Sequence, residues 1–211
     1  MTTIFNDLHQ FTNYVQPIDL SFNQYLLLTE EPILIHTGNI EQAKVIIPKI
    51  KELLGDKKLK YVFASHFESD ECGGLSLILE SFPEVKTICS AITARQLIEF
   101  GITDNVIIQN GGTKLTGDDY DLEFITYPSE MHMWEGVLLF EKKRKIFFSS
   151  DLMFRFGDSH GKIIDGNWKD EVETISLEQI PNEGLKEKIK LELFKISPEF
   201  IAAGHGACVN I

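Results

Sequence analysis

The stretch SHFESDECGG, residues 65–74, decides both the fold and the site of this chain. Within six positions it holds one histidine and three carboxylates, which are His66, Glu68, Asp70 and Glu71. An unbroken apolar run, KYVFAS at 60–65, comes before it, and LSLILESF at 75–82 follows two glycines. The first run is typical of a buried strand and the second of a helix. The acidic cluster therefore lies at the carboxyl end of a predicted strand.

Three further strand-like runs are each followed by a side chain that can bind a metal ion. These are DLEFITYP (121–128) before His132, KIFFSS (145–150) before Asp151 and FIAAG (200–204) before His205. Strand ends on one edge of a sheet converge on a crevice, which is where α/β proteins place their sites. One histidine after a strand is more often a structural residue, but four such strand ends in one chain indicate a shared metal site.

The rest of the chain alternates strands and helices. The predicted elements are strands at 24–29, 32–38 and 86–90 and helices at 41–54, 91–100 and 184–195. Asn39 and Gln42 form a capping-box pattern at the start of the first helix. The stretch 155–180 shows no regular pattern. Helices mixed with strands, and hairpins at the start, favour an α/β sandwich over a purely doubly wound sheet.

The composition fits a single domain spanning residues 1–211. No apolar stretch approaches the roughly 20 residues of a membrane span, and the start, MTTIFNDLHQF, lacks the features of a secretory signal. Three cysteines without a CxxC pair suit a reducing cytoplasm, where we expect the protein. The net charge of −12, from 32 acidic and 20 basic side chains, would repel a phosphate backbone, so we expect no nucleic-acid partner.

The ligand types indicate which metal the site binds. A mixture of imidazoles and carboxylates suits two iron ions, whereas all-oxygen sets suit magnesium or calcium and softer sets suit zinc. Four carboxylates carry the charge that two ferrous ions would balance, and these are Glu68, Asp70, Glu71 and Asp151. Without cations such groups repel one another and some have to be protonated. The crowding of acids beside His66 is therefore explained by bound cations.

At these residues the chain resembles the metallo-β-lactamase superfamily. The similar segments, in the expected order, are NQYLLLTEEPILIHTGN, SHFESDECGG, the isolated His132, FFSSDLMF and AAGHG. Zinc hydrolases of that superfamily carry HxHxDH in the first metal loop, whereas HxExD at residues 66–70 resembles the flavodiiron branch. The resemblance implies an αββα sandwich with two non-haem iron ions that reduces dioxygen or nitric oxide.

Carried over position by position, the resemblance implies a set of metal ligands. His66, Glu68 and His132 would bind one iron, Asp70 and His205 the other, and Asp151 would bridge the two. The chain departs from the family at Glu71, which stands where a histidine is usual and either binds the second iron or leaves a coordination position open. It also departs at His36, where many relatives have aspartate, and we expect His36 to be structural.

The function that follows is a non-haem diiron protein that binds and reduces, or senses, dioxygen or nitric oxide. Residues 1–211 contain no flavodoxin-like domain, so we expect no flavin on this chain and an external electron donor. The first alternative is a non-catalytic oxygen or iron sensor that signals to a protein partner, which the resemblance to stand-alone oxygen-binding diiron proteins supports. The second is a zinc hydrolase of the same fold. A homodimer is compatible with the sequence.

Overall fold

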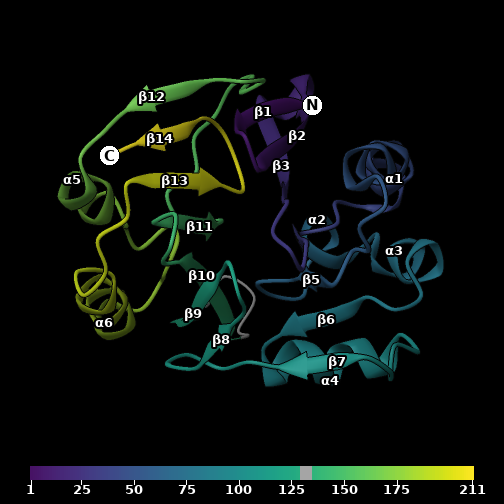
Figure 1. Ribbon diagram of the computed structural model, residues 1–211. Helices are drawn as coiled ribbons and strands as arrows, with labels where there is room; N and C mark the ends of the chain where they lie inside the picture. The colour runs from purple at the N-terminus through teal and green to yellow at the C-terminus, as the bar shows by residue number, and fades with distance from the viewer. Residues whose placement is uncertain (129–134) are drawn as a thin grey trace.

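Two sheets lie face to face in the centre of the molecule (Figure 1). The computed structural model describes residues 1–128 and 135–211, and within these ranges each sheet has seven strands. The predicted ligand His132 falls outside the described residues. Helices cover the outer face of each sheet, so the layers run helix, sheet, sheet, helix.

The first sheet is built from the N-terminal half of the chain. Its strands, in spatial order, are β1 (Thr2–Phe5), β2 (Leu8–Val15), β3 (Leu20–Leu27), β4 (Ile33–Ile35), β5 (Tyr61–Phe63), β6 (Lys86–Cys89) and β7 (Val106–Ile108). Strands β1 to β4 pair antiparallel, and β4 to β7 pair parallel. The parallel strands place their carboxyl ends at one edge, where the acidic cluster follows β5.

The second sheet is built from the C-terminal half. Its strands, in spatial order, are β12 (Ile163–Asp165), β14 (Cys208–Asn210), β13 (Phe200–Ala203), β11 (Ile146–Ser150), β10 (Gly136–Glu141), β9 (Asp121–Tyr127) and β8 (Lys114–Thr116). Strands β11 and β13 are parallel neighbours, with Phe148 opposite Ala202. Their carboxyl ends therefore lie side by side, and these ends carry Asp151 and His205.

The helices begin where the sequence places caps. They are α1 (Ile40–Leu54), α2 (Ser69–Cys72), α3 (Leu75–Ser81), α4 (Ala91–Glu99), α5 (Trp168–Glu173) and α6 (Glu183–Leu193), and a 3₁₀ turn covers Gln16–Ile18. The capping box of α1 is formed: Oδ1 of Asn39 accepts from the Gln42 N–H at 3.0 Å, and Oε1 of Gln42 accepts from the Asn39 N–H at 2.8 Å. Ser90 caps α4 in the same way, accepting from the Thr93 N–H.

Three apolar clusters hold the layers together. The inter-sheet cluster includes Tyr25, Phe63 and Phe148, and it lies between the two sheets. Alternate residues of the strands point outward, toward the helices. Leu34 of β4 packs with α1, and Phe147 of β11 lies near Trp168 of α5. Because strands buried on both faces need apolar residues at every position, the unbroken runs in the sequence follow from this layering.

The predicted α/β sandwich is confirmed, and the structure adds elements that the sequence pattern did not predict. Strands β1 and β2 precede the predicted hairpin, β12 and α5 lie in the stretch 155–180, and β14 follows His205. Strand β12 is exposed along its length and α5 is short, so neither has a strong apolar period. Within the described residues no helix has both the length and the apolar character needed to cross a membrane.

Gly74 is expected to be required for the close contact between the acidic turn and α1. A Cβ at this position would lie 2.4 Å from Cβ of Ala43 and 3.0 Å from the Gly38 carbonyl oxygen. Gly74→Ala should therefore lower the free energy of unfolding by about 1–3 kcal/mol, measured by urea denaturation. Gly184→Ala is the matched control. Gly184 lies in the first turn of α6, where an added Cβ would be 3.5 Å from its nearest neighbouring atom and alanine favours the helix. Equal stability of the two variants would contradict this.

Candidate metal centre

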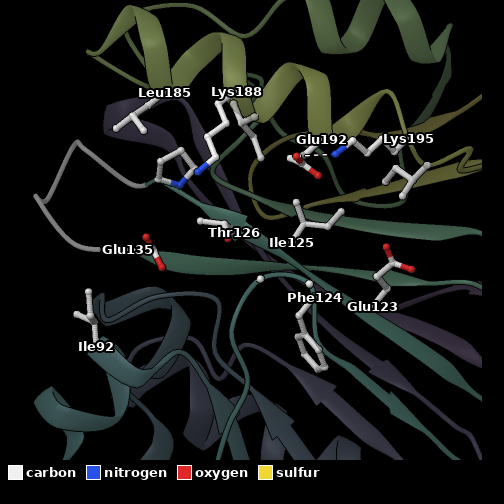
Figure 2. Close-up of a pocket in the computed structure, with 15 residues that line it drawn as sticks. Ile92, Glu123, Phe124, Ile125, Thr126, Glu135, Leu185, Lys188, Glu192 and Lys195 are labelled. Carbon is white, nitrogen blue, oxygen red and sulfur yellow. Dashed lines mark hydrogen bonds and ion pairs between the residues drawn. The ribbon is translucent and has the colours of Figure 1, made fainter.

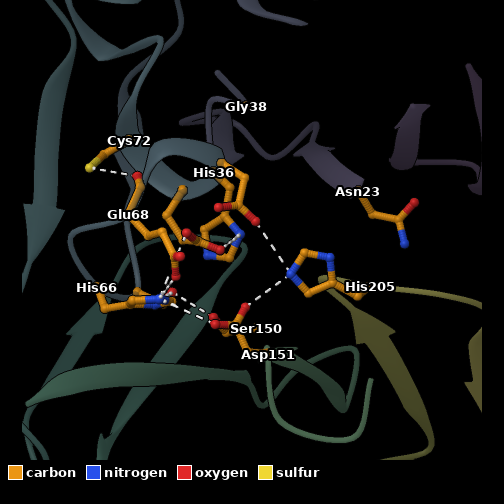
Figure 3. Close-up of polar contacts among 12 residues, drawn as sticks. Asn23, His36, Gly38, His66, Glu68, Cys72, Ser150, Asp151 and His205 are labelled. Carbon is orange, nitrogen blue, oxygen red and sulfur yellow. Dashed lines mark hydrogen bonds and ion pairs between the residues drawn. The ribbon is translucent and has the colours of Figure 1, made fainter. Parts of the chain in front are cut away.

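Side chains from three strand ends and one helical turn meet at one edge of the sandwich (Figure 3). His66 follows β5, Asp151 follows β11 and His205 follows β13. The short helix α2 and the residue before it supply the remaining carboxylates, which are Glu68, Asp70 and Glu71. Six of the seven predicted ligands are therefore brought together, and the seventh, His132, lies outside the described residues.

The imidazole of His66 faces two carboxylates. Its Nε2 lies 3.1 Å from Oε2 of Glu68 and 3.2 Å from Oδ2 of Asp151. The His66 side chain is 2% exposed, whereas Glu68 is 37% exposed. The Glu68 side of the cluster is therefore its solvent-accessible side.

The imidazole of His205 faces a second pair of carboxylates. Its Nε2 lies 3.3 Å from Oδ2 of Asp70 and 3.2 Å from Oδ1 of Asp151. Asp151 thus directs one oxygen to each imidazole, since its Oδ2 approaches His66. A carboxylate placed in this way has the geometry of a bridge between two cations.

Glu71 is common to both sets of possible ligands. One set contains Asp70, Glu71, Asp151 and His205, the other contains His66, Glu68 and Glu71, and within each set the ligand atoms lie within 4.8 Å of one another. Glu71 is 1% exposed, and its Oε2 lies 3.8 Å from Nε2 of His66. Among the described residues this oxygen has no hydrogen-bond partner. A buried carboxylate oxygen without a partner is costly, and a cation would satisfy it.

Hydrogen bonds outside the cluster orient both imidazoles. Nδ1 of His205 lies 3.1 Å from the carbonyl oxygen of Ser21, and a carbonyl can only accept, so the proton is on Nδ1 and Nε2 faces the carboxylates. Nδ1 of His66 lies 3.0 Å from Oγ of Ser65, which also contacts Oγ of Ser150 at 2.7 Å. Contacts of this kind fix the ring orientation of metal-binding histidines.

Asn23 holds the turn that carries His205. Its Nδ2 donates to the carbonyl oxygens of Ala203 at 3.0 Å and Gly206 at 2.9 Å. The partners lie about 180 residues apart in the sequence. No local pattern could identify Asn23 or Ser21, whereas Ser65 is adjacent to His66 and could have been considered from the sequence.

The carboxylates strongly favour protonated imidazoles. Burial alone would lower the pKa of His66, but contacts with Asp151 and Glu68 outweigh it and raise the pKa from 6.5 to about 9. Burial likewise opposes protonation of His205, while Asp151 and Asp70 raise its pKa to about 10. In the metal-free chain, protons on these rings therefore occupy the place that cations would take.

The carboxylates respond to their neighbours in opposite ways. Burial would raise the pKa of Asp151, but the two imidazoles hold it well below its usual range. The pKa of Asp70 is also lowered, because its contact with His205 outweighs its burial. Burial, and then the charges of Asp151 and Asp70, raise the pKa of Glu71 well above its usual range. Glu71 is thus the carboxylate that most needs a cation in order to be ionised.

The arrangement fits two metal ions. Metal–ligand bonds of about 2.0–2.2 Å place neighbouring ligand atoms about 3.0–3.4 Å apart. Four separations between imidazole nitrogens and carboxylate oxygens in the cluster fall in this range, at 3.1, 3.2, 3.2 and 3.3 Å, and the separation between His66 and Glu71 is longer, at 3.8 Å. The mixed nitrogen and oxygen donors, together with the partnerless oxygen of Glu71, suit a pair of divalent transition-metal ions.

A separate cavity of about 650 Å³ lies between β9 and α6 (Figure 2). Its polar lining includes Lys188, Glu192 and Lys195, and the last two form an ion pair at 2.7 Å. Its described lining residues include neither histidine nor cysteine. The cavity therefore offers no set of metal ligands comparable to the strand-end cluster.

Two other side chains near the cluster are not ligands. Cys72 is buried, its Sγ donates to the Glu68 carbonyl oxygen at 3.3 Å, and burial raises its thiol pKa to about 12. A thiol that stays protonated is a poor metal ligand. His160 is exposed and its Nδ1 lies 2.6 Å from Oδ1 of Asp158, which agrees with a surface role.

Several known proteins resemble this chain over all or part of its length. The rubredoxin-oxygen oxidoreductase of Megalodesulfovibrio gigas is 23% identical over 219 residues, covering 95% of this chain and 51% of that protein. The nitric oxide reductase of Moorella thermoacetica is 24% identical over 133 residues, covering 62% of this chain and 33% of that protein. The chain thus spans between about a quarter and a half of the length of the curated relatives that it matches.

Solved structures and a family model agree on the fold. The flavodiiron protein from Giardia intestinalis superposes with a TM-score of 0.78 at 18% identity, covering 99% of this chain and 55% of that chain. This likeness confirms the expected metallo-β-lactamase sandwich. The model described as "ODP family beta lactamase" matches residues 20–206. The chain therefore belongs to the ODP family of β-lactamase-like proteins.

Proposed function

We propose that the protein holds two non-haem iron ions and uses them to bind and reduce dioxygen or nitric oxide. The observation that carries the proposal is the position of Asp151, whose two oxygens each lie 3.2 Å from an imidazole on a different strand end. The relatives named as an oxygen oxidoreductase and a nitric oxide reductase support the choice of diatomic substrates.

The proposed ligands divide into two sets joined by carboxylates. His66 and Glu68, with His132 from outside the described residues, would hold one iron, and Asp70 and His205 would hold the other. Asp151 would bridge them. Glu71 would be a further ligand, because it belongs to both groups of side chains and has a buried oxygen with no hydrogen-bond partner among the described residues.

The iron ions, when bound, would supply electrons to the diatomic substrate, and an external donor would restore them. The protein's part is to bind and orient. Ser21 and Ser65 hold the two imidazoles with Nε2 toward the metals, and Tyr127 lies edge-on to His66 with ring centroids 5.8 Å apart. The exposed side chain of Glu68 marks the side from which substrate and electrons would arrive.

The two alternative functions differ from the proposed one in the metal that is bound or in whether the protein turns over its substrate. A zinc hydrolase is disfavoured because Glu68 provides a carboxylate where that class has an imidazole, and Glu71 adds another. A sensor would use the same two irons without sustained turnover. Continuous oxygen consumption with a flavin reductase and reduced nicotinamide as donor supports the reductase, and a single round of oxidation supports the sensor.

Anaerobic loading with ferrous iron should give about two irons per chain. The expectation follows from two groups of mixed imidazole and carboxylate ligands. Elemental analysis measures the content, and exposure to air should then produce near-ultraviolet absorption from the oxidised pair. A single tightly held zinc that iron cannot displace would contradict the proposal.

Asp151→Ala and Asp70→Ala should have different effects on iron content. Asp151 contacts both described imidazoles, so its loss should remove both irons, whereas Asp70 contacts the imidazole of His205 but not that of His66, and its loss should remove mainly one. Asp158→Ala, which removes an exposed carboxylate, is the control and should retain two. Full iron content in Asp151→Ala would show that this residue is not a bridge. Circular dichroism of each variant checks the fold.

Metal binding should release about two protons per chain from the imidazoles at pH 7, and Glu71, whose pKa is also raised, should add to this release. His66 and His205 are protonated in the metal-free chain, with pKa values of about 9 and 10, and both must lose a proton to bind a metal. The apparent affinity for the metal pair should therefore rise by at least about a hundredfold per pH unit between pH 7 and 8, and less steeply as the pH approaches the His66 pKa of about 9. Calorimetry in two buffers of different ionisation enthalpy measures the release, and a release near zero would contradict the assigned ligands.

The stability of the metal-free chain should have the opposite dependence on pH. The folded-state pKa values of both histidines lie above 6.5, so their contribution to stability is complete below pH 6.5 and disappears as the pH rises through 9 to 10. Thermal unfolding of the metal-free protein at pH 6 and pH 9.5 tests this, and a higher melting temperature at pH 9.5 would contradict it.

A further inference from the structure

His36 occupies an unusual backbone position beside the metal centre. It follows β4, and its φ of 62° lies in the left-handed region that side chains other than glycine seldom adopt. The residue is 4% exposed, and its ring stacks near Phe63 with centroids 6.1 Å apart. Its Nε2 is buried and has no hydrogen-bond partner among the described residues.

Backbone hydrogen bonds join the turn that carries His36 to the turn that carries two predicted ligands. The N–H of Thr37 donates to the Glu71 carbonyl at 2.9 Å, and the N–H of Gly38 donates to the Asp70 carbonyl at 3.0 Å. On the other side, the His36 N–H donates to the Phe63 carbonyl at 2.8 Å. The position of the His36 backbone relative to the Glu71 backbone is therefore set by main-chain contacts, independently of any metal.

The imidazole of His36 faces the carboxylate of Glu71. Nδ1 lies 3.9 Å from Oε1, which is beyond hydrogen-bond distance in the metal-free chain. The other oxygen, Oε2, lies toward His66 at 3.8 Å. Glu71 thus has one oxygen toward His36 and one toward the candidate metal centre. In Figure 3, His36 appears between Glu68 and His205. The two departures from the family pattern, at positions 36 and 71, are neighbours in space.

We propose that His36 is the positioning residue for Glu71: in the metal-loaded chain its Nδ1–H donates to Oε1, so that Oε2 is held toward the metals. This inference rests on the proposed diiron function. It explains why a strained, buried histidine without a ligand role lies at this point. It also predicts that the donor and the acceptor can be exchanged between the two positions, since a carboxylate at 36 would hold an imidazole at 71 equally well.

The test is an exchange of the two residues. The variants are His36→Asp, Glu71→His and the double variant, and aspartate tolerates the left-handed backbone at position 36. Anaerobic titration with Co²⁺ measures stoichiometry and affinity, and the visible Co²⁺ spectrum reports the coordination. Each single variant should lower the affinity for the second metal ion by about 10- to 100-fold, because two carboxylates or two imidazoles then face each other. The double variant should recover to within about threefold of the unmodified chain.

Controls separate this inference from the proposed function and from misfolding. His160→Asp makes the same change of charge on an exposed loop and should bind Co²⁺ normally. His36→Asn, which also tolerates the backbone but has a shorter side chain, should lose about tenfold in affinity.

Additive losses in the double variant, or unchanged affinity in both His36→Asp and His36→Asn, would overturn the role of His36 while leaving the diiron proposal intact. Fewer than two Co²⁺ ions in the unmodified chain would overturn the proposed function itself, and with it this inference.

Discussion

The mutual repulsion of buried carboxylates is the constraint on which the rest of this structure depends. Asp70, Glu71 and Asp151 lie within 4.8 Å of one another at the edge of the sandwich, and Glu68 lies beside them. The metal-free chain offsets this charge with protons on two imidazoles and on Glu71, as the raised pKa values indicate. Protons replace the missing cations only in part, because Oε2 of Glu71 still has no hydrogen-bond partner among the described residues. Two divalent cations would satisfy the whole cluster, which is why the geometry is best understood as a metal centre.

The fold brings these groups together through the direction of its strands. Strands β4 and β5 are parallel in the first sheet, and β11 and β13 are parallel in the second. Each pair ends at the same edge of the sandwich, so one imidazole comes from the first sheet and the other from the second. Asp151 contacts both and therefore connects the two halves of the molecule. The side chains of the candidate centre therefore also link the two sheets.

Local features of the fold and the clustering of six candidate ligands could be predicted, whereas the supporting contacts could not. The capping box at Asn39 and the strand ends before Asp151 and His205 are signalled by a few consecutive residues, and the structure confirms them. Strand β12 is exposed throughout and β14 has only three residues, so their pairing with distant strands had no local signal. Asn23 is likewise recognisable only once β3 is next to the turn at 203–206.

The weakest element of the candidate centre carries two of its four carboxylates. Helix α2 has four residues, too few to be stable alone, and it carries Asp70 and Glu71. Its carbonyls accept hydrogen bonds from the N–H groups of the turn after β4, and the Thr37 hydroxyl of that turn also donates to the Glu71 carbonyl at 3.3 Å. A bound ion would add stability on top of this, about 2.7 kcal/mol when its free concentration is 100 times the dissociation constant. The turn after β4 therefore places α2 before any ion binds, and under the proposed function the metals would determine how strongly that arrangement is held.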